Sequence, residues 1–147
     1  MYLLDTNHRS KIIKGDDTLL LRLKQTSIEG FSVCTTVFGE LVFMACNSGF
    51  QTANLEKVLD FCSRLRFFPL DSETGQVYGR LKAVLLAEIG PKEAAKRRGF
   101  RLQTLGIHDN DLWIASVAIQ HDLVVLTGDK DFARIAKHSA LQHESWL

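Results

Sequence analysis

Two aspartates stand directly after short apolar runs, where an acid can reach a bound ligand. Asp5 follows Tyr2-Leu3-Leu4, and Asp129 follows Val124-Val125-Leu126-Thr127-Gly128. Such runs predict buried strands, and in an open α/β sheet ligands bind outside the carboxyl ends of the strands. Helix N-capping is the alternative, and for either aspartate alone it is the better explanation. The two placements together favour a shared site if the two strands are neighbours in the sheet.

Glu40 is the only charged residue between Glu29 and Glu56. The apolar residues around it cover nearly the whole circumference of a helix, which predicts a helix buried on all sides. A lone carboxylate there is costly unless it is paired or coordinates a metal. A capping box would need Ser or Thr at position 37, which is Val37. A buried ion pair with a distant base stays open as an alternative, but we favour a metal or catalytic role.

Asp111 is the last of three consecutive polar residues that begin a predicted helix, after Asp109 and Asn110. One residue is enough for the N-cap, so a cap by Asp109 or Asn110 leaves Asp111 for another task. Its helical neighbours Ala115 and Ala118 are small, which predicts that its face packs inward. Stabilisation of the positive helix end by the acids is the alternative, and it is compatible with a site.

Four carboxylates without a cysteine or histidine ligand pattern form a hard, oxygen-rich set of donors. Such donors suit Mg²⁺ or Mn²⁺ rather than zinc, and neighbouring acids need a cation to ionise together. A bound divalent ion can orient a water, lower its pKa and stabilise charge on a phosphodiester. We therefore predict a phosphate-ester substrate, with Mg²⁺ or Mn²⁺ as cofactor. The predicted catalytic residues and metal ligands are Asp5, Glu40, Asp111 and Asp129.

Strand and helix patterns alternate along the chain, which predicts an α/β fold with a parallel sheet covered on both faces. Apolar runs predict strands at 2–4, 31–34, 67–68, 123–126 and near 141–143. Helical patterns predict helices from Asp16 or Asp17 to 26, from 35 or 36 to 47, and over 54–66, 72–88, 109 or 110–121 and 129–137, with a basic helical stretch to Arg98.

The composition fits one domain over residues 1–147, because 46% of the residues are apolar and 24% are charged. Three cysteines, an odd number without C-x-x-C spacing, argue against a disulfide framework or a cysteine zinc site. The sequence shows neither a signal-peptide pattern nor an apolar stretch long enough for a membrane span. We therefore expect a cytoplasmic protein with no membrane partner.

The formal net charge of +1 gives no nucleic-acid signature in bulk, yet the charges are unevenly placed. From 79 to 106 the basic residues outnumber the acidic ones, and from 107 to 147 the acidic residues are in excess. A basic segment beside an acidic metal site would hold a phosphate backbone. A solvated helix face is the alternative, and it is the better explanation for a run such as 96–98 alone. The weakly predicted substrate-binding residues are Lys96, Arg97, Arg98 and Arg101.

Four collinear motifs resemble those of PIN-domain nucleases, in particular the VapC toxins of bacterial toxin–antitoxin pairs. They are Asp5-Thr6-Asn7, Glu40-Leu41-Val42, Asn110-Asp111-Leu112-Trp113-Ile114-Ala115 and Thr127-Gly128-Asp129-Lys130-Asp131-Phe132. The resemblance spans about the whole chain. It implies a PIN-like three-layer α/β/α fold with a central, mainly parallel sheet, and Mg²⁺- or Mn²⁺-dependent endoribonuclease activity. By the family pattern Asp5, Glu40 and Asp111 are the core acids and Asp129 the fourth, and Asn7 and Thr127 support the site through polar contacts.

The resemblance also implies partners, namely an RNA substrate, a second copy of the chain in a homodimer, and a cognate VapB-like antitoxin. Two features depart from the compact family pattern. The segment 89–105 before the third acid is longer than usual, and Asp131 competes with Asp129 for the fourth position. Two other functions stay open: a PIN-type RNA-processing nuclease without a toxin role, and a non-catalytic α/β binding module.

Overall fold

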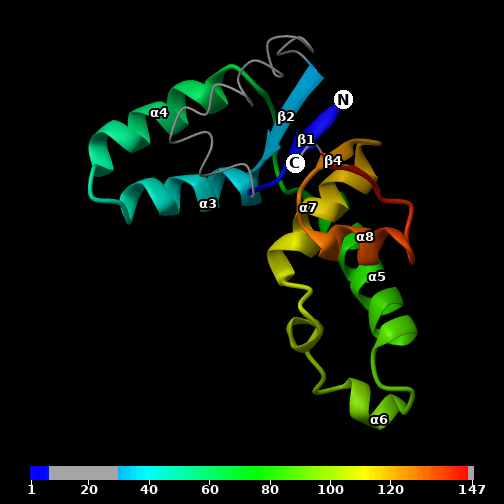
Figure 1. Ribbon diagram of the computed structural model, residues 1–147. Helices are drawn as coiled ribbons and strands as arrows, with labels where there is room; N and C mark the ends of the chain where they lie inside the picture. Colours follow the sequence, from blue (N-terminus) through cyan, green and yellow to red (C-terminus); the bar gives the residue numbers. More distant parts are fainter. Residues whose placement is uncertain (7–29, 146–147) are drawn as a thin grey trace.

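The computed structural model describes residues 1–6 and 30–145, which build a parallel sheet flanked by helices (Figure 1). The elements are β1 (Tyr2–Leu4), β2 (Phe31–Cys34), α3 (Thr35–Cys46), α4 (Gln51–Ser63), β3 (Arg66–Phe68), α5 (Ser72–Ile89), α6 (Ala94–Arg97), a 3-10 turn (Leu102–Leu105), α7 (Asp109–Gln120), β4 (Val124–Leu126), α8 (Lys130–Ala136) and β5 (Gln142–Glu144). The predicted α/β fold is confirmed. Asn7 and the helix predicted from Asp16 or Asp17 lie outside the described residues.

The sheet has the strand order β3-β2-β1-β4-β5, and every neighbouring pair is parallel. β1 lies between β2 and β4, with Leu4 opposite Leu126. The chain adds β2 and β3 on one side of β1 and then returns to place β4 on the other side. Such a reversal of strand order opens a crevice at the carboxyl ends of the strands, and ligands bind there. The two strands that precede Asp5 and Asp129 are therefore neighbours at this crevice.

Helix α7 is the central packing element next to this crevice. It packs against α3, α5, α8 and β4, and it buries most of its apolar side chains, including Leu112, Ile114 and Val117. Contacts on several sides fix its first turn relative to the strand ends. No helix in the described ranges is both long and apolar enough to cross a membrane.

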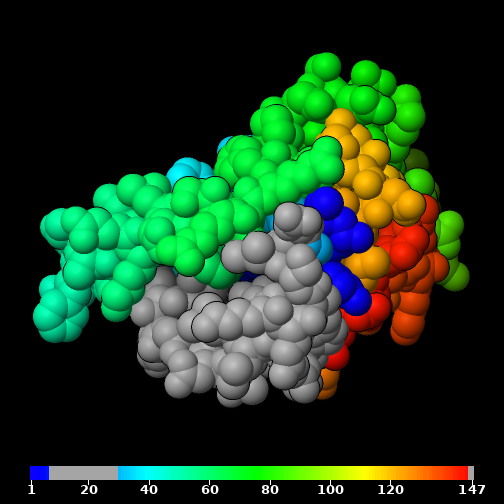
Figure 2. Space-filling model, turned by 90° about the horizontal axis from the view of Figure 1, so that it is seen from above, coloured from blue at the N-terminus to red at the C-terminus, as the bar shows by residue number. Residues whose placement is uncertain are grey.

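Helices α3 and α4 pack on each other and project from the body of the molecule (Figures 1 and 2). The expectation that the helix around Glu40 is buried on all sides is wrong. Only Val37, Leu41 and Ala45 are fully buried on α3, and Phe43 is 68% exposed. The helix packs mainly through one stripe against β2, α4 and α7; Phe38 and Val42 are partly buried against the core, and Phe43 faces solvent.

The helix predicted over 54–66 is α4, and it begins and ends three residues earlier. Asn54 lies inside the helix, and its side-chain amide donates a hydrogen bond to the Ser48 hydroxyl (2.9 Å) in the preceding turn. The helix instead begins after Phe50, whose side chain makes no cap hydrogen bond. Arg66 belongs to β3, where it lies opposite Ser32 of β2.

Candidate active site

Asp5 is buried at the carboxyl end of β1, with only 3% of its surface exposed. Its backbone N–H donates to the carbonyl of Leu126 on β4 (3.2 Å), which keeps the two strand ends side by side. Its Oδ2 accepts a hydrogen bond from the Thr127 hydroxyl (2.7 Å), and its Oδ1 accepts one from the backbone N–H of Thr6 (2.6 Å). These bonds fix the orientation of the carboxylate.

Asp129 caps helix α8 and lies beside the same threonine. Its Oδ1 accepts from the backbone N–H of Asp131 (2.9 Å), and its own N–H donates to the Thr127 hydroxyl (2.9 Å). The capping role considered as the alternative is therefore real. Because the Thr127 hydroxyl also donates to Asp5, one buried side chain ties the acids after β1 and β4 together.

Asp131, the competing fourth acid, is engaged elsewhere. Its carboxylate forms an ion pair with Arg134 (2.9 Å) on the next turn of α8. The same guanidinium donates to the backbone carbonyl of Leu105, in the loop that leads into α7. These contacts give Asp131 a structural partner of opposite charge.

Asp111 lies in the first turn of α7, half-buried near two other acids. Its Oδ2 accepts from the backbone N–H of His108 (3.0 Å), which occupies the N-cap position. The predicted N-cap by Asp109 or Asn110 is therefore wrong, because His108 occupies that position and Asp111 accepts its N–H. Burial raises the pKa of the Asp111 carboxyl to about 6, the hydrogen bond from His108 opposes this, and the charges of Asp5 and Asp129 raise the pKa further. The three carboxyl groups therefore interact across the strand ends.

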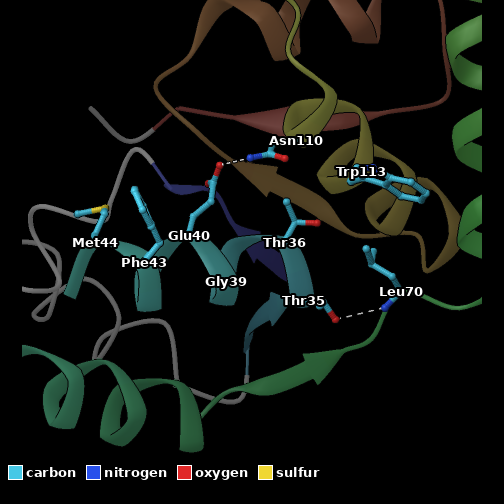
Figure 3. Close-up of a pocket in the computed structure, with 9 residues that line it drawn as sticks. All are labelled: Thr35, Thr36, Gly39, Glu40, Phe43, Met44, Leu70, Asn110 and Trp113. Atoms are coloured by element: carbon cyan, nitrogen blue, oxygen red, sulfur yellow. Dashed lines mark hydrogen bonds between the residues drawn. The ribbon is translucent and has the colours of Figure 1, made fainter. Parts of the chain in front are cut away.

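Glu40 reaches this region from α3, where its Oε1 accepts a hydrogen bond from the side-chain amide of Asn110 (Figure 3). Its Oε2 is buried and has no hydrogen-bond partner among the described residues. No ion pair to Glu40 occurs in residues 1–6 and 30–145, so the ion-pair alternative finds no support there. Our sequence reasoning missed the role of Asn110, because it considered this residue only as a helix cap.

The donors present fit a hard divalent cation. They are carboxylate oxygens, one of them buried without a partner, and the Asp111 carboxyl lies in the field of two other acids. A cation would relieve both conditions. In the described part of the chain, no three acids, histidines or cysteines stand close enough to enclose an ion. Mg²⁺ does not require such an enclosure, because it commonly binds through one or two carboxylates and retains several waters.

A second polar cluster lies beside the first turn of α7, around Asp109. The Asp109 Oδ1 accepts from the Tyr78 hydroxyl and from the Lys82 ammonium, both at 2.7 Å. Its Oδ2 accepts from the Gln103 amide (2.9 Å). These hydrogen bonds, that from Lys82 foremost, lower the pKa of Asp109. Tyr78 also stacks on Trp113 with ring centroids 3.9 Å apart, so this cluster fastens α5 to α7.

The basic residues predicted to bind substrate do not gather at the acids. Helix α6 lies at the far end of the molecule from α3 and β1 (Figure 1). Lys96 pairs there with Glu93 (3.1 Å), and Arg97 donates to the carbonyl of Lys92 (2.8 Å). Arg101 lines a cavity of about 250 Å³ beside Lys82. That these bases and Arg98 bind RNA which extends beyond the acids remains a prediction.

Comparisons with known proteins agree with the fold. The sequence profile of the PIN domain matches residues 2–138. Ribonuclease VapC5 of Mycobacterium tuberculosis is 33% identical over 85 residues, a match that covers 58% of this chain and about half, 49%, of that protein. The structure of VapBC2 from Rickettsia felis, bound to a DNA fragment from their promoter, is 26% identical with a TM-score of 0.77, and the match covers 99% of this chain and 98% of that chain. The DNA-bound VapBC of Salmonella typhimurium gives a TM-score of 0.78 at 23% identity, over 99% and 98% of the two chains, which shows a shared fold.

Proposed function

Because this chain belongs to the PIN domain family, we propose that it is a divalent-metal-dependent endoribonuclease. The proposed catalytic residues and metal ligands are Asp5, Glu40, Asp111 and Asp129, of which one or two would bind the ion directly and the others through waters that it retains. The observation that carries the proposal is the placement of Asp5 and Asp129 at the ends of neighbouring strands, joined through the Thr127 hydroxyl, at the switch point of the sheet. Similarity to a protein named Ribonuclease VapC5 supports RNA as the substrate class.

These oxygens would hold Mg²⁺ or Mn²⁺, which would supply an activated water and neutralise charge on the phosphodiester. The chain itself keeps the acids in fixed orientations. Thr127 and Thr6 orient Asp5, and the backbone of His108 orients Asp111. Asn110 holds one oxygen of Glu40, which leaves Oε2 for the metal or a metal-bound water. Asn7 stays a predicted supporting residue.

The proposal is tested by RNA cleavage with purified protein in Mg²⁺, in Mn²⁺ and in EDTA. We expect cleavage with either metal and none in EDTA. Asp5→Asn keeps the shape of the side chain and should lower the rate by at least about 100-fold, because it removes a charged ligand from the metal site. Asp60→Asn, at an exposed acid of α4 that pairs with Arg64, is the matched control and should cleave like wild type. Equal cleavage by wild type and by folded Asp5→Asn would contradict the proposal.

We further propose that the nuclease acts as the toxin of a VapBC-like pair, with a VapB-like antitoxin and a second copy of the chain as its protein partners. The similar VapBC structures support this assignment. Expression should arrest growth, and co-expression of a small protein encoded next to this chain should relieve the arrest. Light scattering should give the mass of a dimer. Cleavage without growth arrest would instead favour an RNA-processing nuclease.

A further inference from the structure

A cavity of about 620 Å³ opens beside Glu40, between α3, the segment that precedes α5, and α7 (Figure 3). We propose that it is a nucleoside subsite, which takes the base next to the cleaved phosphodiester and so gives the enzyme a base preference. The inference rests on the proposed function, since it concerns the same RNA strand. It assigns a role to residues outside the acid set, above all to Phe43.

The cavity adjoins the acid site through Glu40. Glu40 and Asn110, which are hydrogen-bonded to each other near the strand ends, also line the cavity. In RNA each base is joined through one ribose to its phosphate. A phosphodiester held at the acids therefore brings its flanking nucleosides into the adjoining space, and on the Glu40 side that space is this cavity. This adjacency favours RNA over an apolar segment of a protein as the occupant.

Phe43 provides a surface on which a base can stack. It lies one helical turn after Glu40, and the two side chains point to the same side of α3 (Figure 3). The Phe43 side chain is 68% exposed, an unfavourable position for a large apolar group in a free enzyme. Exposed aromatic rings are the usual stacking platforms for unpaired RNA bases. An exposed ring beside a catalytic carboxylate thus has a specific use in a ribonuclease.

The other walls suit a planar, partly polar ligand. Met44 and Leu70 add apolar surface, and Thr36 and Asn110 add groups that form hydrogen bonds. The backbone N–H of Leu70 donates to the Thr35 hydroxyl (3.3 Å), which fastens the segment before α5 to the start of α3. An apolar lining with a few fixed polar groups is typical of small-ligand sites and gives them their selectivity.

The first test maps cleavage sites in a pool of RNA with random sequence, in Mg²⁺, for wild type, Phe43→Leu and Phe43→Ala. Phe50→Ala is the control, because Phe50 is equally apolar, is 78% exposed and lies outside this cavity. We expect a base preference at one position next to the cut in wild type. Phe43→Ala should flatten that preference and lower kcat/KM about tenfold through lost stacking. Phe43→Leu should show the same change in part, and Phe50→Ala should retain both properties.

The second test separates binding from cleavage. Asp5→Asn protein is mixed with a short RNA that carries 2-aminopurine, whose fluorescence falls when the base stacks. We expect the Asp5→Asn protein to quench the 2-aminopurine fluorescence. The double variant Asp5→Asn/Phe43→Ala should not quench it. If wild type cleaves RNA but the Phe43 variants match it in rate, preference and quenching, the subsite is refuted while the proposed function stands. Quenching that depends on Phe43, without cleavage by wild type, would refute the proposed function and support the subsite.

Two further outcomes would overturn the inference. If wild type neither cleaves nor binds RNA, both the function and the subsite fail. If Phe43→Ala leaves RNA cleavage and quenching intact but abolishes the dimer or the complex with the antitoxin, the cavity belongs to a protein partner.

Discussion

Asp109 and Asp111 lie two residues apart in the first turn of α7, yet their surroundings are opposite. Asp109 accepts hydrogen bonds from Tyr78, Lys82 and Gln103, and its pKa is lowered. Asp111 accepts one from the backbone of His108, faces two other acids, and its pKa is raised to about 6. The positive end of the helix acts on both residues, so it does not explain the difference. The different hydrogen-bond partners and neighbouring charges of the two residues explain why their pKa values shift in opposite directions.

In this small domain, the two sides of one helical turn divide stability from chemistry. The Asp109 cluster has a cation for its acid and joins α5 to α7, whereas Asp111 is partly buried and lies in the field of Asp5 and Asp129. Like charges held together in a partly buried place lower the stability of the metal-free fold and provide a ready site for a cation.

The largest expected effect is on catalysis. Asp111→Asn should lower metal-dependent RNA cleavage by at least about 100-fold, because it removes a charged ligand while keeping an acceptor for the His108 N–H. Asp109→Asn should stay within about tenfold of wild type, because its contacts are structural. The measurement is kcat/KM on one RNA substrate in Mg²⁺. Similar losses in the two variants would remove the distinction between the two sides of the turn.

The fourth acid extends the comparison to α8. Asp129→Asn should lower cleavage about tenfold or more, because Asp129 shares the Thr127 hydroxyl with Asp5 and its charge acts on Asp111. Asp131→Asn should cleave at nearly the wild-type rate and lose the ion pair to Arg134. Parallel cleavage assays and thermal melts distinguish the two variants. A larger loss of cleavage in Asp131→Asn would assign the fourth position to Asp131 instead.

Stability should change in opposite directions. In EDTA at pH 7, Asp109→Asn should lower the free energy of unfolding by about 1 kcal/mol, since Lys82 loses its charged partner in a half-exposed place. Asp111→Asn should raise it by about 1 kcal/mol, since a disfavoured charge is removed and solvent screening moderates the gain. Urea unfolding measures both. Destabilisation by Asp111→Asn would show that its carboxylate is favoured in the metal-free fold.

The smallest effect is in the pH dependence. Between pH 4 and 6 the folded protein holds a proton on Asp111 that the unfolded chain, with a carboxyl pKa of 3.8, has released. This residue therefore makes wild type less stable as pH rises through that window. The stability gain of Asp111→Asn should grow from pH 4 to 6. For Asp109, whose folded pKa is lowered, the loss in Asp109→Asn should instead disappear as the pH falls below about 4. Parallel curves for Asp111→Asn and wild type would contradict the raised pKa.

The sheet and the position of Asp5 and Asp129 followed from sequence because strands and helices alternate, and each acid follows a strand. The helix around Glu40 was misjudged because hydrophobicity does not reveal which stripe of α3 packs inward. The Glu40–Asn110 hydrogen bond could not be predicted, since it joins residues 70 positions apart through the packing of α3 on α7. The N-cap of α7 is His108 rather than one of the acids, because the backbone conformation at the end of the preceding loop decides where the helix begins. All four metal ligands and the RNA-binding bases stay predictions.

The loop before α7 is fastened just ahead of the third acid. Gly106 adopts a positive φ of 88°, the buried Ile107 donates its N–H to the carbonyl of Leu102 (3.2 Å), and Arg134 holds the carbonyl of Leu105. These contacts therefore fix the position of Asp111 independently of the long segment that includes α6. Residues 90–100 form a stretch whose length evolution or protein engineering can change, by insertion or deletion, while the acid site keeps its geometry.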